Sequence, residues 1–197
     1  MEATSRASSQ VITVVSGLPR SGTSMMMAML EAGGIQPLVD DHRPADESNR
    51  NGYYEFEPVL ASRESVDWVP AAKGKAVKVI YALLDSLPRG FEYRVIFMIR
   101  DISEVVESQQ KMLKRIGKEG AALPPEKLEG IFERERERSL TWLSDQENFQ
   151  VLEIDFQQAL TEPEVCSQAI SNFLGGDLDL EEMAKIASPE LRTVSRN

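Results

Sequence analysis

The segment from Gly17 to Ser24 reads GLPRSGTS and combines two glycines with a cation and three hydroxyl side chains. It follows an apolar run at 11–15 and opens a stretch, Thr23–Ala32, that contains neither glycine nor proline. A glycine-rich turn between a strand and a helix presents successive backbone N–H groups and a helix N-terminus to an oxyanion. Arg20 places a positive charge within this turn. The segment therefore predicts a phosphate-binding loop.

The loop lacks the lysine that nucleoside-triphosphate sites of this shape use. The pattern G-x-x-x-x-G-K-[ST] has lysine directly after its second glycine, where this chain has Thr23. A conventional ATP site is therefore not expected. A P-loop kinase of a small molecule stays an alternative, because the apolar run 95–99 leads to Asp101, a residue type that can hold magnesium.

The sequence PRSGTS after an apolar strand resembles the 5′-phosphosulfate-binding loop of the sulfotransferases, whose members carry lysine or arginine where this chain has Arg20. Arg100 follows the apolar run 95–99 and Ser108 comes eight residues later, an arrangement similar to the 3′-phosphate site of that family. The alternative is that Arg100 pairs with Asp101 or Glu104 near the start of the next helix and that Ser108 is an exposed polar position. The resemblance implies a P-loop sulfotransferase fold and the donor 3′-phosphoadenosine 5′-phosphosulfate, whose sulfuryl group moves to a hydroxyl or amine. The donor-binding residues that it implies are Pro19, Arg20, Ser21, Gly22, Thr23, Ser24, Arg100 and Ser108.

Later parts of the chain extend the resemblance to about residues 10–192. The segments VLEIDF at 151–156, LTEP at 160–163 and FLG at 173–175 are similar to the late strand, turn and helix of bacterial sulfotransferase-like proteins. The chain departs from the family in one respect, because it has no G-x-x-G-x-x-K segment of the kind that completes the 3′-phosphate and adenine contacts of cytosolic sulfotransferases. Arg192 and Arg196 are candidates for that role.

No motif fixes the general base that an acceptor hydroxyl or amine requires. The family uses histidine in some branches and glutamate in others; the single histidine, His42, lies in a polar connection where a solvated position is the alternative. Glu55 lies within YYEFE at 53–57, where aromatic neighbours can raise the pKa of a carboxylate. Its alternative is aromatic core packing with the glutamates facing water. Glu55 is the preferred base, and Lys78 is a candidate contact for the sulfuryl oxygens unless it is a surface lysine.

Apolar runs at 11–15, 76–81, 95–99 and 149–154 predict four buried strands, and helical patterns alternate with them. The order predicts an α/β fold with three layers, α/β/α, around a central parallel sheet. We expect a single domain over residues 11–197 after a flexible segment, 1–10. The last predicted helix, 164–174, is expected to turn these side chains inward: Val165, Ala169, Ile170, Phe173 and Leu174.

The overall composition limits the kinds of partner that we expect the protein to bind. The formal net charge of −10 disfavours binding to nucleic acid or to an anionic membrane, so the expected partner is a small-molecule or glycan acceptor. A single cysteine and a single histidine exclude an internal disulfide and a structural zinc site, so no metal is expected. No targeting or membrane-spanning segment is evident, and a cytoplasmic protein is expected. Because the chain is short and its base is not fixed, a nucleotide-binding protein that has lost catalysis is a further alternative.

Overall fold

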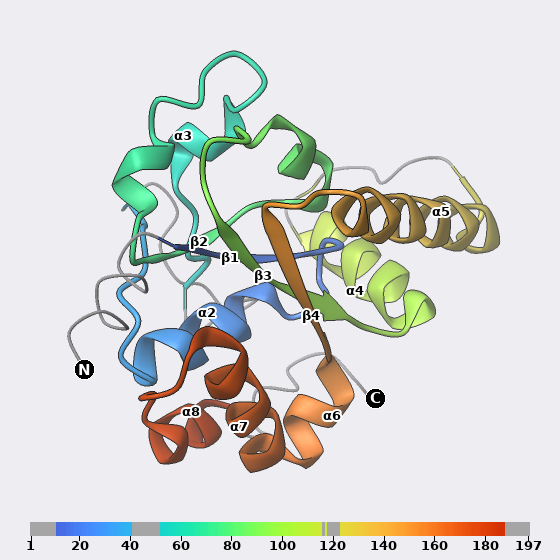
Figure 1. Cartoon of the computed structure of the whole chain (residues 1–197). Coiled ribbons are helices and arrows are strands. Elements are labelled where there is room, and N and C mark those ends of the chain that lie inside the picture. The colour runs from blue at the N-terminus through green and yellow to red at the C-terminus, as the bar shows by residue number, and fades with distance from the viewer. Residues whose placement is uncertain (1–10, 41–51, 116, 118–122, 188–197) are drawn as a thin grey trace.

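The computed structural model describes residues 11–40, 52–115, 117 and 123–187 (Figure 1). Its centre is a four-stranded sheet with the strand order β2-β1-β3-β4, in which every pair of neighbours is parallel. The residues of β1 are all buried, as expected for a run of β-branched residues at the middle of a parallel sheet. The strands are β1 Ile12–Gly17, β2 Ala76–Lys78, β3 Tyr93–Ile99 and β4 Phe149–Asp155.

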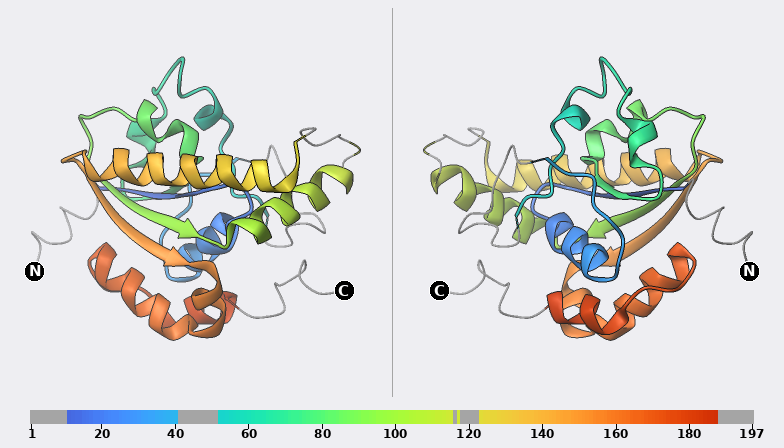
Figure 2. Two further views of the ribbon diagram at one scale, coloured as in Figure 1. Left: turned by 90° about the vertical axis from the view of Figure 1, so that its right-hand side faces the viewer. Right: turned by 90° about the vertical axis from the view of Figure 1, so that its left-hand side faces the viewer.

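Helices cover both faces of this sheet. Figure 2 shows α5 lying across one face, while α6, α7 and α8 lie against the other. The three-layer α/β/α architecture expected from the sequence is therefore confirmed. The helices and 3₁₀ segments are α2 Thr23–Ala32, α3 Glu57–Leu60, η1 Val69–Ala72, η2 Tyr81–Ser86, α4 Ile102–Arg115, α5 Pro125–Ser144, α6 Phe156–Thr161, α7 Pro163–Leu174 and α8 Leu180–Ile186.

Alternating side chains of the strands divide the core into two layers. Val15, Ile96 and Met98 pack under α2, α7 and α8, while side chains of opposite parity face α3, the 3₁₀ segments and the end of α5. A third, smaller cluster joins Leu18 of the phosphate loop to α4 and α5. The loop is therefore anchored by apolar packing on the helix that carries Ser108.

Two details of the expected structure are wrong. The strand expected at 76–81 ends at Lys78, because the chain leaves the sheet at Ile80 and turns into η2. Val165 is 57% exposed, because the buried stripe of α7 passes through Cys166, Ile170 and Leu174 at helical spacing. All residues from Met25 to Leu30 are buried, because α2 packs against α8 as well as against the sheet.

The structure also contains short elements that the sequence did not indicate, namely α3, the two 3₁₀ segments, α6 and α8. Within the described ranges, no helix is long and apolar enough to cross a membrane. The expected flexible segment 1–10 lies outside the described residues.

Candidate functional site

The phosphate loop joins the carboxyl end of β1 to the N-terminus of α2. Both of its glycines have positive φ, 146° at Gly17 and 101° at Gly22. A Cβ atom at Gly17 would lie 2.8 Å from the carbonyl oxygen of Met98, and one at Gly22 would lie 2.4 Å from Cδ2 of Phe156. Both positions therefore need glycine for conformation and for space, so the loop is built against β3 on one side and Phe156 on the other.

Arg20 adopts a left-handed conformation, with φ 67°, and its side chain reaches α4. Its Nε donates a hydrogen bond of 3.0 Å to Oγ of Ser108, a residue 88 positions away in sequence. Ser108 is 3% exposed. The alternative that Ser108 is an exposed surface position is therefore wrong, and the two segments on which the resemblance rests form one connected site.

Arg100 lies at the end of β3, and three contacts hold its guanidinium. Nη1 donates 3.0 Å to the backbone carbonyl of Arg20, and Nε donates 2.9 Å to Oε2 of Glu104. The Cζ atom lies 4.4 Å from the centroid of the Phe156 ring, a cation–π geometry. The side chain of Arg100 is only 12% exposed. The structure thus brings together Arg20, Arg100 and Ser108.

Asp101, the candidate magnesium ligand of the kinase alternative, caps helix α4 instead. Its Oδ1 accepts a hydrogen bond of 2.5 Å from Oγ of Ser103 and one of 3.1 Å from the backbone N–H of Glu104. The bond from Ser103, followed by the one from Glu104, lowers the pKa of Asp101 below its ordinary value. Among the described residues, no group of three or more His, Cys, Asp or Glu side chains could hold a metal ion.

Two buried hydroxyls at the loop lack hydrogen-bond partners within the described part of the chain. They are Oγ of Ser16, at the end of β1, and Oγ of Ser21, within the loop. The two residues are 0% and 1% exposed. A buried hydroxyl without a partner costs free energy unless a ligand or water pairs with it, so the orphaned Ser21 hydroxyl fits a loop that receives an oxyanion.

The candidate acceptor-side residues lie next to the loop. Ser24 Oγ and Lys78 Nζ both donate to the backbone carbonyl of Tyr53, which ties the 53–57 segment to the start of α2 and the end of β2. Lys78 Nζ also lies 3.7 Å from Oε1 of Glu55. The side chains of Lys78 and Glu55 are 10% and 31% exposed. Lys78 is thus not a surface lysine, and Glu55 faces a cation rather than open water, whereas Glu57 is exposed.

Tyr54 fixes the backbone just before Glu55. It has a positive φ of 51°, which is uncommon for a residue with a bulky side chain, and its hydroxyl donates 2.5 Å to Oε2 of Glu31 on α2. Burial, together with the nearby Glu31 carboxylate, raises the pKa of Tyr54 above its ordinary value. The turn that carries Glu55 is therefore held by α2, the helix that follows the phosphate loop.

Sequence reasoning missed the role of Phe156. It named Glu104 only as an alternative partner of Arg100, a pairing that the structure contains, and Tyr54 only as an aromatic neighbour of Glu55. Phe156 directly follows Asp155, which caps α6 by accepting 2.8 Å from the backbone N–H of Gln158. That cap was a readable signal for a helix start at the end of β4, where site residues of parallel sheets gather. His42, Arg192 and Arg196 lie outside the described residues.

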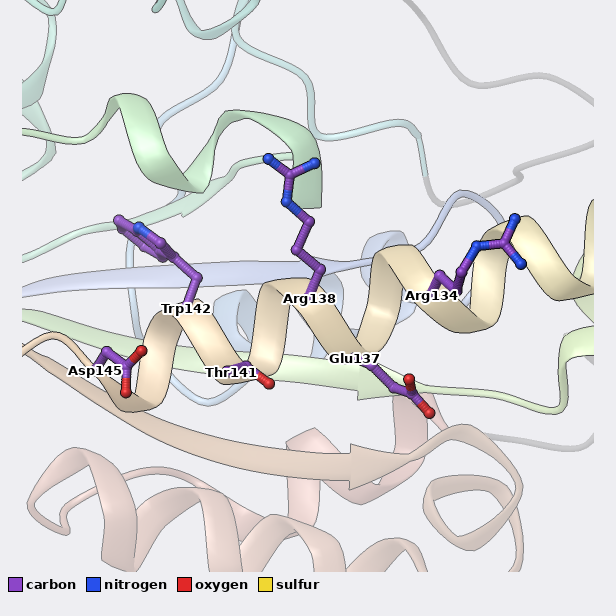
Figure 3. Close-up of a pocket in the computed structure, with 6 residues that line it drawn as sticks. All are labelled: Arg134, Glu137, Arg138, Thr141, Trp142 and Asp145. Atoms are coloured by element: carbon purple, nitrogen blue, oxygen red, sulfur yellow. The ribbon is translucent and has the colours of Figure 1, made fainter.

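A separate hollow of about 480 Å³ runs along α5 (Figure 3). Figure 3 shows Arg138 and Trp142 pointing to the same side of the helix, with Glu137 on another. Its two arginines are matched by two carboxylates, so the hollow offers no net charge to an anion. The lining residues are Arg134, Glu137, Arg138, Thr141, Trp142 and Asp145.

Comparisons with solved structures find the same fold. A mouse sulfotransferase complexed with PAP is 16% identical, with a TM-score of 0.52 over 89% of this chain and 62% of the mouse chain. A retinol dehydratase in complex with androsterone and inactive cofactor PAP is 15% identical, with a TM-score of 0.51 and coverages of 89% and 62%. The sulfotransferase domain from the curacin biosynthetic pathway is 14% identical, with a TM-score of 0.54 and coverages of 94% and 78%. This chain therefore spans less than two thirds of the length of the first two relatives.

A search of curated protein sequences finds no match. The family model described as "Sulfotransferase domain", however, matches residues 12–189, nearly the whole chain. The chain belongs to the sulfotransferase domain family.

Proposed function

We propose that the protein transfers a sulfuryl group from 3′-phosphoadenosine 5′-phosphosulfate to a hydroxyl or amine of a small-molecule or glycan acceptor. The observation that carries this proposal is the contact between the loop and the second site, made by Arg20 with Ser108 and by Arg100 with the Arg20 carbonyl. Two anion-binding groups joined in this way suit a nucleotide with phosphates at both its 5′ and 3′ positions. Family membership and the PAP named for two relatives support the same donor.

The loop residues act on the phosphosulfate in this proposal. The acceptor oxygen or nitrogen bonds to sulfur while the bond from sulfur to the bridging phosphate oxygen breaks, and negative charge develops on that oxygen. Backbone N–H groups of the loop and the Arg20 guanidinium stabilise this charge as it forms. Pro19 and Gly22 shape the loop, and the hydroxyls of Ser21 and Thr23 add donors. The hydroxyl of Ser24, which donates to the Tyr53 carbonyl in this structure, would have to turn to the donor nucleotide. The leaving product is PAP, 3′-phosphoadenosine 5′-phosphate.

Glu55 is our proposed base, which takes the proton from the acceptor. Its position beside the phosphate loop supports this role. Glu55 lies 3.7 Å from Lys78, and Lys78 and Ser24 of the loop both donate to the Tyr53 carbonyl. In this proposal, Lys78 faces the sulfuryl oxygens of the donor that the loop binds. His42 remains the alternative base, and a cytoplasmic location remains a prediction.

The two other functions differ in what they require. A small-molecule kinase would need a magnesium ligand, and the capping role of Asp101 speaks against that residue. A protein that binds the nucleotide without transferring sulfuryl would keep the Arg20, Arg100 and Ser108 contacts but would not need Glu55.

Calorimetric titration with PAP in the absence of magnesium, with ATP in parallel, tests the proposal without knowledge of the acceptor. Arg20→Ala and Arg100→Ala should each weaken PAP binding roughly 10- to 100-fold, because a hydrogen bond to a charged group contributes about 1.5–3 kcal/mol. Arg134→Ala, an exposed arginine on α5, is the matched control and should leave binding unchanged. Absence of PAP binding, or a preference for magnesium-ATP, would refute the proposal.

Catalysis is tested with Glu55→Gln and the neighbouring Glu57→Gln, using release of PAP from the donor across a panel of acceptors. Loss of turnover in the first variant alone, with PAP affinity retained, supports Glu55 as the base. Donor binding without turnover by the wild-type protein on any acceptor would favour the non-catalytic function.

A further inference from the structure

Glu104 forms an ion pair with Arg100, the cation that would bind the 3′-phosphate in the proposed function. Its Oε2 accepts a charge-assisted hydrogen bond of 2.9 Å from Nε of Arg100. The side chain of Arg100 is 12% exposed and that of Glu104 is 43% exposed, so the arginine is the more buried member of the pair. A carboxylate is therefore the anion that lies beside Arg100 in this structure.

Helix capping does not explain this carboxylate. Asp101 and Glu104 form the D-x-x-E pattern of a capping box, in which the glutamate ordinarily accepts from the backbone N–H of the capping residue. Here only the Asp101 half of the box is formed, since Asp101 Oδ1 accepts from the N–H of Glu104. The Glu104 carboxylate turns instead to Arg100. The pairing of Glu104 with Arg100 is therefore not needed to cap the helix.

The contacts of Arg100 determine which part of its guanidinium is left for a ligand. Nε is taken by Glu104, Nη1 donates to the Arg20 carbonyl, and the Phe156 ring covers one face of the guanidinium. A phosphate that binds this arginine approaches the same planar group that the carboxylate already neutralises. Two anions then share one cation, which is unfavourable relative to the phosphate alone.

We propose that Glu104 is an internal counter-ion, which holds Arg100 in position and lowers the affinity of the site for a 3′-phosphorylated nucleotide, so that PAP leaves faster. This inference rests on the proposed function, because it assumes that a 3′-phosphate reaches Arg100. Glu104 acts through Arg100 and is a positioning residue, not a catalytic one. It preserves the shape of the site and limits the strength with which the product is held.

Glu104→Gln is the variant that separates charge from shape. The glutamine amide oxygen can still accept from Nε, so Arg100 keeps its position while the negative charge is removed. For a dianionic phosphate roughly 7 Å from the carboxylate in a largely aqueous medium, Coulomb's law gives roughly five- to tenfold tighter binding in the variant. The gain should appear mainly as slower dissociation, because most affinity differences lie in that rate.

The experiment is a calorimetric titration of the full chain with PAP and with 5′-AMP, which lacks the 3′-phosphate, followed by stopped-flow measurement of PAP dissociation. Glu107→Gln is the matched control, since Glu107 lies on the same helix, is 61% exposed and pairs with Lys111 rather than with the site. We expect Glu104→Gln to bind PAP more tightly, and both variants to bind 5′-AMP as the wild type does.

Glu104→Ala provides a second measurement. It removes the charge and also the acceptor for Nε, so its gain in PAP affinity should be smaller than that of Glu104→Gln. Equal or weaker PAP binding by Glu104→Gln overturns the inference and makes Glu104 a residue that only orients Arg100. An equal gain for 5′-AMP overturns it too, because the effect would then not depend on the 3′-phosphate. A wild-type protein that binds no PAP refutes the proposed function instead, and this inference with it.

Discussion

Replacement of Gly22 by alanine tests the idea that the loop is built against Phe156. Gly22 has φ 101°, and a Cβ atom there would lie 2.4 Å from Cδ2 and 2.8 Å from Cε2 of the Phe156 ring. Gly34 has nearly the same φ, 99°, but a Cβ atom there would have no neighbour within 4 Å. Gly34→Ala therefore carries the backbone strain of the substitution without the steric clash.

The expected magnitudes follow from these two terms. Left-handed backbone costs an alanine about 1–2 kcal/mol, which is the whole effect expected for Gly34→Ala. Displacement of a packed side chain adds about 1–3 kcal/mol, so Gly22→Ala should lower the free energy of unfolding by about 2–5 kcal/mol. For a chain of this length each kcal/mol corresponds to a change in Tm of about 2–4 °C. The two variants should therefore differ clearly.

Urea denaturation of the two variants, of Phe156→Ala and of the double variants Gly22→Ala with Phe156→Ala and Gly34→Ala with Phe156→Ala measures the steric term directly. A double-mutant cycle should give a coupling of about 1–3 kcal/mol between positions 22 and 156 and none between 34 and 156. PAP affinity should fall in Gly22→Ala but not in Gly34→Ala, because the displaced ring also stacks on Arg100.

Equal losses of stability in Gly22→Ala and Gly34→Ala would refute this reasoning. They would mean that Phe156 moves aside without cost and does not define the loop. An unchanged PAP affinity in Gly22→Ala would refute the further claim that this ring holds Arg100 for the ligand.

Two other predictions concern positions around the site. Ser62→Ala removes the buried acceptor, 3.0 Å away, of the Trp68 indole N–H and should cost about 1–3 kcal/mol in the free energy of unfolding measured in urea, whereas Ser144→Ala on the exposed side of α5 should cost little; a loss equal to that of the control would contradict the burial argument. The pKa of Tyr54 is raised, so the folded state keeps a proton that the unfolded chain loses above the ordinary value of 10.0. The contribution of Tyr54 to the free energy of unfolding is therefore fully present below that pH and declines as the pH rises above it. Tyr54→Phe should therefore lose less stability than the wild type between about pH 9 and about pH 11, and identical slopes would contradict this.

The sequence predicted the parts of the site that local patterns encode. The glycine spacing around Arg20, the apolar run before Arg100 and the hydroxyl of Ser108 each lie within a short segment whose secondary structure follows from its own residues. The order of elements then predicted the three-layer fold, because alternating strands and helices favour a parallel sheet.

The contacts that were missed depend on residues far apart in the chain. Phe156 touches Gly22 and Arg100 only because β4 lies beside β3, and no periodicity shows which strands become neighbours. The pairing of Lys78 with Glu55 likewise joins the end of β2 to an irregular segment. The strand at 76–81 was overestimated because its apolar residues continue past the sheet, where Ile80 remains 42% exposed.

The order of the strands has a consequence for how the chain acquires its site during synthesis. Ser16 and Gly17 pair with Phe97 and Met98 of β3, so the loop lacks its supporting strand until about eighty further residues have been synthesised. Pairing between strands so distant in sequence is intrinsically slow. A nascent chain released before β3 would carry the entire phosphate-loop sequence and still have no phosphate cradle. The loop is thus translated well before the strand that completes it.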